Sequence, residues 1–334
     1  MVNDNENYGK NSSIVNTIRK LLGQETYISK EKPLKKETLQ VLNELNGKAS
    51  KQNLKNVRKV DKLTEELVKT CNNVLLRREK DCQCYDSEKN PESNYKTCIN
   101  KNKSKPKCEA YNRCRRIFAN SLTGHEPDYR PADWEDPLVE GTHNCYMYFL
   151  NDQKQSLKKK CMKICKDKGK NNSACKTKKH NGCSNLKPQP GNHAHLQGNL
   201  KSSKKRIYSC PAMVDKVLKD NYKKGTQKSK IIHWDNLTHH QQFIKKCPNN
   251  YYKGVLVVHP ENTYHFYRQD KSGKFSHKQG TLRVEDRDAS DNVIYVPHMA
   301  DMNYSKDDNG GINYTDFCGY MCVPSNKHAD THAE

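Results

Sequence analysis

Fifteen cysteines in a chain of 334 residues constrain the fold more than any other feature of this sequence. Only 33% of the residues are hydrophobic and the mean hydropathy is -1.11, so only part of the chain can form a well-packed core. Polar segments of this kind need disulfide bonds or a bound metal to hold a defined shape. Because the number of cysteines is odd, at least one thiol must stay unpaired within the chain.

Most of the cysteines fall into two groups. The first group lies in a polar segment and comprises Cys71, Cys82, Cys84, Cys98, Cys108 and Cys114. The second lies in a lysine-rich stretch and comprises Cys161, Cys165, Cys175 and Cys183. The second group is a candidate zinc site, but its spacing matches no common zinc finger, so disulfides or plain thiols are the favoured interpretation. We also expect Cys318 and Cys322 to tie down the C-terminal strand region.

The charge is strongly positive, with 60 lysines and arginines against 38 aspartates and glutamates, a formal +22. This charge favours anionic partners such as nucleic acid through long-range attraction, and the competing interpretation is a solvated lysine-rich surface. No window approaches eighteen consecutive apolar residues, and the first residues lack the apolar core of a signal peptide. We therefore expect no transmembrane segment and no secretory leader.

Helical spacing of apolar residues dominates the N-terminal part. It begins near Ser12, resumes after Pro33, and predicts a third helix from about Lys51 to Leu76. We expect residues 1–70 to form a small basic helical module, followed by a Cys-rich segment over residues 71–124. The module is expected to dock a partner or nucleic acid, with a solvated appendage as the alternative, because lysine-rich helices need a packing partner to be stable.

Strand signals concentrate after residue 250. The expected strands cover residues 254–258, 264–269, 274–279, 282–285 and 293–296, with a hairpin turn at 270–273. Because helices precede this antiparallel sheet, the fold class is α+β. The domain is expected to span residues 125–327, with a Lys- and Cys-rich insertion at 153–186 and a tail at 328–334.

Cys145 lies at the start of an aromatic and aliphatic run that predicts a buried helix. Thr142 and Asn144 are candidate N-caps, which would place the thiol in the first helical turn. The helix dipole is positive there, so a thiolate is stabilised and its pKa is lowered, as in many cysteine nucleophiles. The competing interpretation, which this stretch taken alone favours, is a small residue packed inside a buried helix.

Two histidines form a candidate relay with Cys145. His265 and His277 lie on the two strands of the expected hairpin, and strand alternation can place both on one face. Cysteine catalysis needs one imidazole to take the thiol proton and a second polar group to orient that imidazole. Each histidine alone fits a half-buried sheet residue or a hairpin surface residue better, so the hypothesis depends on all three residues together.

The order of these features resembles the NlpC-type branch of the papain-like cysteine hydrolases. The resemblance covers roughly residues 141–285 and consists of the helix-start cysteine, the turn at 187–191 and the two strand histidines. It implies a papain-like fold with Cys145 as nucleophile, His265 as general base and His277 as orienting group. It also implies a peptide or isopeptide substrate and no cofactor.

A second resemblance covers about residues 125–325. The segments 143–146, 187–191, 265–270 and 317–324 look similar to an uncharacterised group of proteins from large DNA viruses and microbes. This resemblance implies a viral source and a location in the host cytoplasm or the virion. The first functional hypothesis is therefore a cysteine peptidase or amidase. The alternative is a structural protein of the virion, such as a minor capsid protein, that is cross-linked by disulfides, contacts other virion proteins and has a vestigial active site.

Overall fold

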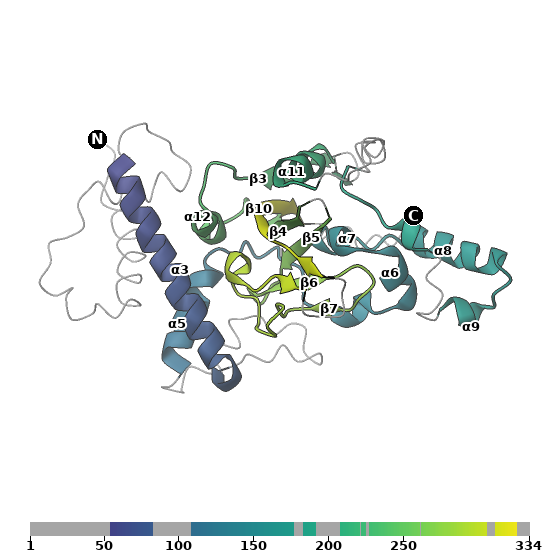
Figure 1. Cartoon of the computed structure of the whole chain (residues 1–334), viewed down its shortest axis with the longest axis horizontal. Helices are drawn as coiled ribbons and strands as arrows, with labels where there is room; N and C mark the ends of the chain where they lie inside the picture. The colour runs from purple at the N-terminus through teal and green to yellow at the C-terminus, as the bar shows by residue number, and fades with distance from the viewer. Residues whose placement is uncertain are drawn as a thin grey trace, which may run out of the picture. The chain divides into compact units, whose positions relative to one another are not determined.

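The computed structural model describes residues 54–82, 108–176, 183–191, 208–220, 222–224, 227–260, 262–305 and 311–325, which divide into two compact units (Figure 1). The helices expected near Ser12 and after Pro33 lie outside the described residues. Cys84, Cys98 and the expected tail at 328–334 also lie outside them. Each unit is considered by itself.

The smaller unit is helical in its described part. Its elements are α3 (Leu54–Cys82), α5 (Glu109–Ala119) and α12 (His239–Ile244). Two disulfides, Cys71–Cys114 and Cys82–Cys108, join the chain of α3 to that of α5. In addition, Phe118 packs edge-to-face on Phe243, with ring centroids 4.7 Å apart. The unit therefore combines residues from the expected helical module, the Cys-rich segment and the expected α+β domain.

The larger unit is built on a six-stranded antiparallel sheet, green to yellow in Figure 1. In spatial order its strands are β3 (Ile232–His233), β10 (Asp316–Pro324), β4 (Tyr251–His259), β5 (Thr263–Gln269), β6 (Phe275–Lys278) and β7 (Val284–Glu285). Two-stranded sheets form from β1 (Tyr222–Lys224) with β2 (Gln227–Ser229) and from β8 (Asn303–Tyr304) with β9 (Ile312–Asn313). The predicted α+β class with an antiparallel sheet is confirmed.

One face of the sheet is covered by two helices, α7 (Cys145–Phe149) and α11 (Cys210–Lys219). The buried cluster beneath them includes Tyr146, Met147, Phe149, Met213, Val217, Leu256, Phe266 and Met321. Full burial of one such side chain contributes about 1.5–3 kcal/mol, so this cluster makes a large contribution to the stability of the unit. Alternation turns the neighbours His265 and Tyr267 to the opposite face of β5.

The larger unit contains six further helices in its described part. They are η2 (Pro131–Trp134), α6 (Pro137–Thr142), α8 (Gln155–Asp167), α9 (Asn172–Cys175), η4 (Ser184–Leu186) and η5 (Pro297–Met299). The helix α8 lies within the expected insertion and presents exposed lysines, Lys159, Lys160, Lys163 and Lys166. Its two cysteines are buried one turn apart on the other side of the helix.

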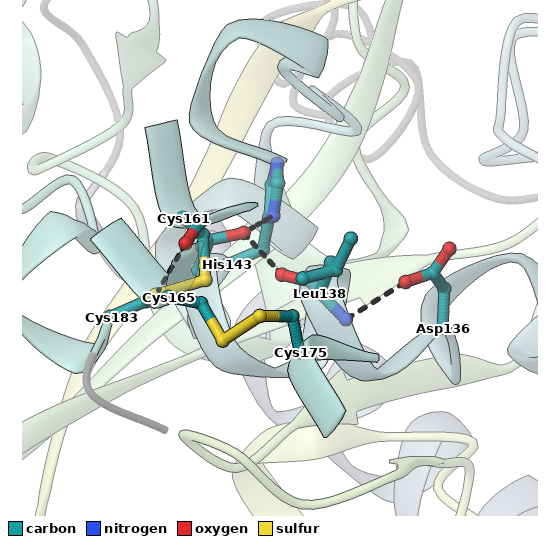
Figure 2. Close-up of a disulfide and its surroundings, with 8 residues drawn as sticks. Asp136, Leu138, His143, Cys161, Cys165, Cys175 and Cys183 are labelled. Atoms are coloured by element: carbon teal, nitrogen blue, oxygen red, sulfur yellow. Dashed lines mark hydrogen bonds between the residues drawn. A yellow bond between two sulfur atoms is a disulfide. The ribbon is translucent and has the colours of Figure 1, made fainter. Parts of the chain in front are cut away.

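The candidate zinc ligands Cys161, Cys165, Cys175 and Cys183 are paired as disulfides. Figure 2 shows the two bridges, Cys161–Cys183 and Cys165–Cys175, close to α6. A cysteine in a disulfide has no thiolate to offer a metal, so the zinc interpretation is wrong for this structure. Within the described ranges there is also no cluster of three His, Cys, Asp or Glu side chains that could hold a metal ion.

The expected cross-linking of the C-terminal strand is confirmed. Cys318 and Cys322 both lie in β10 and pair with Cys210 at the start of α11 and with Cys247 just before β4. These bridges attach the strand to chain segments 108 and 75 residues away in the sequence. This last described strand is thereby held between β3 and β4 in the sheet.

Residues 293–296 do not form the strand that their apolar character predicts. All four are buried, but the only pairing that they form within the described chain is an isolated bridge between Val293 and Arg287. Ile294 O also accepts the N–H of Phe275 at 2.8 Å, so the segment lies against the start of β6. The apolar run therefore predicted burial correctly, but it did not predict a strand. Pro297 follows directly and has no N–H to donate to a neighbouring strand.

Gly254 offers a first test, because it lies in β4 directly against the ring of Phe149. A Cβ atom at this position would lie 2.2 Å from Phe149 Cε2. We expect Gly254→Ala to lower the free energy of unfolding by about 1–3 kcal/mol through overpacking, measured by urea denaturation. Combining it with Phe149→Leu should cost less than the sum of the single changes. Additive costs would contradict the close approach.

The disulfides of the larger unit offer a second test. Cys247–Cys322 closes a separation of 75 residues and Cys165–Cys175 a separation of 10. If the bridges act on the unfolded chain, replacing the first pair by alanine should cost about 4–5 kcal/mol and the second about 2–3 kcal/mol. Urea denaturation of both variants measures the difference. The reverse order would show that loop closure does not govern their contribution.

Candidate active site

Cys145 is the first residue of α7, as the sequence predicts. Asn144 is the N-cap, and its side-chain oxygen accepts the N–H of Met147 at 3.2 Å. The amide nitrogen of Asn144 donates to Pro188 O at 2.7 Å. A single side chain therefore caps the helix and attaches the turn at 187–191 to it. Within the described residues Cys145 is the free cysteine, while the others there are paired in disulfides.

Cys145 lines a cavity of about 500 Å³. The start of α7, the turn at 187–191, the start of β5 and the loop after β6 contribute to its wall, which includes Asn144, Lys187, Gln189, Tyr264, His265 and Tyr314. The structure thus brings Cys145 and His265 to one cavity. Among the described residues, however, no hydrogen bond joins the Cys145 thiol to an imidazole. Catalytic hydrogen bonds are often long before substrate binds.

The two histidines are hydrogen-bonded to each other. His277 pairs with Tyr267 across β5 and β6, and so its side chain lies on the same face as that of His265. His265 Nε2 lies 2.9 Å from His277 Nδ1, and His277 Nε2 lies 2.9 Å from Arg287 O. The predicted neighbourhood of the two histidines is therefore observed.

This hydrogen-bond chain fixes the tautomers of both rings. A carbonyl oxygen only accepts, so Arg287 O requires the proton of His277 to be on Nε2. His277 Nδ1 must then accept from His265 Nε2–H. As a result, His265 Nδ1 is the nitrogen without a proton. A neutral imidazole in this tautomer can act as a base.

Burial keeps both histidines neutral. Their side chains are not half-buried or at the surface, since each residue is only 1% exposed. Burial lowers the pKa of His265 well below its usual value, and neighbouring His277 and Lys278 act in the same direction. Burial also lowers the pKa of His277 to about 4, against the opposing hydrogen bond to Arg287 O.

The thiol is neutral as well. Burial raises the pKa of Cys145 to about 12, and smaller contributions from the backbone N–H of Phe266 and the charge of Lys278 oppose it. The expectation that the helix start lowers this pKa is therefore wrong. Loss of solvation outweighs the dipole, because α7 has only five residues and the sulfur is almost completely buried.

A buried ionic network beside the site was not predicted from the sequence. Arg268 Nε and Nη2 donate to Asp270 Oδ1 at 3.1 and 3.0 Å, and the guanidinium lies 4.0 Å from the centre of the Tyr148 ring. Arg268 Nη1 also donates to Asn151 Oδ1 at 2.8 Å. These contacts join the end of α7 to the β5–β6 hairpin. The available signal was a pair of opposite charges two residues apart, with Arg268 near the end of β5 and Asp270 directly after it.

Two other polar residues support the site. Asp220 Oδ2 accepts from Tyr146 Oη at 2.6 Å and from Gly191 N at 2.7 Å, so a buried carboxylate joins α7 to the turn at 187–191. His143 precedes the cap residue but has a structural role. Its Nε2 accepts from Lys154 N at 3.0 Å and its Nδ1 lies 2.8 Å from Thr142 Oγ1, in the region shown in Figure 2.

Comparison with known proteins gives one partial match among curated proteins. The chain is 38% identical over 69 residues to "Insoluble matrix shell protein 1" from Ruditapes philippinarum, and the match covers 21% of this chain and 40% of that protein. No family model matches the chain, and no solved structure matches it.

None of the helices in the described ranges has the length and apolar character needed to cross a membrane.

The burial of His277 gives a pH dependence of stability that can be measured. Its pKa is 6.5 ordinarily and about 4 in the folded chain, so the stability that it contributes is present above pH 6.5 and lost as the pH falls towards 4. The loss is up to about 3 kcal/mol. Urea denaturation at about pH 7.5 and pH 4.5 should show a smaller pH dependence for His277→Asn than for the wild type.

The comparison between variants is needed because other buried groups titrate in the same range. His143 has a pKa lowered to about 4 by burial and acts in the same direction as His277. Asp270 has a pKa raised to about 6 by burial, so its contribution increases as the pH falls. An identical pH dependence in wild type and His277→Asn would show that His277 is not held neutral.

Proposed function

We propose that the protein is a papain-like cysteine hydrolase of the NlpC type that cleaves peptide or isopeptide bonds. Cys145 is the nucleophile, His265 the general base and His277 the orienting group. The observation that carries the proposal is the hydrogen-bond chain from Arg287 O through both histidines. It leaves an unprotonated nitrogen on His265, a residue that lines the same cavity as the free cysteine.

The proposed reaction starts from a neutral thiol and a neutral imidazole. As Cys145 Sγ attacks the carbonyl carbon of the amide, its proton moves to His265 Nδ1. His265 then gives this proton to the leaving amine as the C–N bond breaks, which leaves a thioester on Cys145. Water then attacks the thioester carbonyl while His265 takes its proton, the C–S bond breaks and the acid is released. His265 returns the proton to Cys145 Sγ, which restores the neutral thiol. His277 keeps the ring of His265 in the reactive tautomer throughout.

The high pKa of the thiol makes the base essential in this scheme. A thiol with a pKa of about 12 contains very little thiolate at neutral pH, so proton removal must accompany attack. This differs from an enzyme in which a thiolate and an imidazolium exist before substrate binds. Activity should therefore depend on His265 more than on the start of α7.

The base can be tested without a known substrate by measuring alkylation of Cys145 with iodoacetamide between about pH 6 and pH 9. We expect His265→Ala to slow the reaction about 100-fold, because proton removal is lost. His277→Asn should slow it less, since an amide can accept from His265 and donate to Arg287 O. Circular dichroism controls for folding. If folded His265→Ala keeps the wild-type rates at every pH, the Cys-His pair does not operate.

A structural role is the second candidate, and two observations favour it. The described residues contain six disulfides, and the partial match is to a protein whose name describes an insoluble shell matrix. In this proposal the disulfides make a rigid component that contacts other structural proteins, of a virion or of another assembly. Cys145, His265 and His277 would then be a vestigial site. Unchanged alkylation in His265→Ala is the outcome that this candidate predicts.

A further inference from the structure

Lys187 is distinctive among the residues around Cys145. Of the described residues that line the cavity, it alone carries a formal charge at neutral pH. The others contribute apolar groups, hydroxyls, amides, the thiol and a neutral imidazole. The described residues also include no carboxylate that forms an ion pair with Lys187. Among the described residues, the positive charge of Lys187 is therefore balanced by no negative charge in the cavity wall.

The backbone that carries Lys187 is fixed with respect to the nucleophile. Pro188 O accepts from the Asn144 amide at 2.7 Å, and Asn144 is also the cap of α7. Gln189 Nε2 donates to Lys187 O at 3.2 Å, while Gln189 Oε1 accepts from the hydroxyl of Tyr264. Prolines at 188 and 190 further restrict this turn. The ammonium thus extends from a rigid support.

We propose that Lys187 determines specificity by binding a carboxylate of the substrate close to the bond that Cys145 attacks. This inference rests on the proposed hydrolase function and deepens it, because it defines the substrate class as amides with a neighbouring carboxylate. An ammonium that has lost part of its hydration gains a charge-assisted hydrogen bond when a carboxylate enters. A neutral substrate of the same shape leaves the ammonium unpaired.

Lys187 is half-buried, and burial lowers its pKa, while the nearby thiol of Cys145 acts in the opposite direction. The closeness of these two groups suggests a different role, in which Lys187 only stabilises the thiolate. The two roles differ in one respect that can be measured. A thiolate-stabilising lysine accelerates every reaction at sulfur, whereas a carboxylate-binding lysine accelerates only reactions with anionic partners.

Two alkylating reagents distinguish these roles. Iodoacetate and iodoacetamide both form a thioether with Cys145 and release iodide, but only the first carries a carboxylate. We expect the ratio of their rates at Cys145 to fall about fivefold or more in Lys187→Met, because one attractive charge is lost. Lys187→Arg should retain most of the ratio. The matched control is Lys159→Met, which removes an exposed lysine of α8 and should leave the ratio unchanged.

A second measurement tests the proposal if alkylation of Cys145 is too slow to measure. N-acetylglutamate should raise the melting temperature of the wild type more than N-acetylglutamine does, and this difference should disappear in Lys187→Met. If both reagents slow equally in Lys187→Met, or if neither the rate ratio nor the melting difference depends on Lys187, the proposal is wrong. If His265→Ala leaves alkylation unchanged while the ratio still depends on Lys187, the carboxylate site stands and the hydrolase proposal fails.

Discussion

Helix α7 approaches β4 as closely as the missing side chain of Gly254 permits, and the rest of the site depends on this contact. The ring of Phe149 fills the space above Gly254 and packs on Phe266 with centroids 4.6 Å apart. A helix of five residues is not stable in water by itself, so tertiary packing must supply its stability. The aromatic contact fixes the end of α7, and the Asn144 cap with its bond to Pro188 O fixes the start. Cys145 is thereby held in one position.

The same packing determines the charge state of the site. A sulfur and two imidazoles that are almost completely removed from water are most stable as neutral groups, and their pKa values shift in opposite directions for this one reason. The hydrogen bond from His277 to Arg287 O then selects the tautomer of each ring. In the proposed hydrolase, the site is thus prepared by its geometry and by the position of its protons rather than by a preformed thiolate. Burial is also the reason why the dipole at the start of α7 does not lower the pKa of Cys145.

Local features of the site could be predicted from the sequence, and features that depend on distant contacts could not. The Asn144 cap and the shared face of His265 and His277 follow from spacing over a few residues, through N-cap chemistry and strand alternation. The place of β10 between β3 and β4 depends on pairing with segments far away in the chain, which periodicity does not encode. The pKa of Cys145 depends on how completely other segments cover it. Arg287 contributes only its backbone carbonyl to the hydrogen-bond chain of the two histidines, so the type of side chain at this position could not predict that contact.

Burial of Cys145 also explains how a free thiol persists in a chain whose other described cysteines are oxidised. Disulfide exchange requires a thiolate that can reach another sulfur. With a pKa of about 12 and an exposed fraction of 6%, Cys145 offers little thiolate and little access. The burial that raises the pKa of this thiol therefore also protects it from pairing with a wrong partner. A cysteine with a lowered pKa at this position would react faster, but it would compete for the disulfides that hold α11 and β10 together. In the proposed hydrolase, a neutral, buried nucleophile with a separate base satisfies both demands, because proton removal by His265 accompanies attack on the substrate.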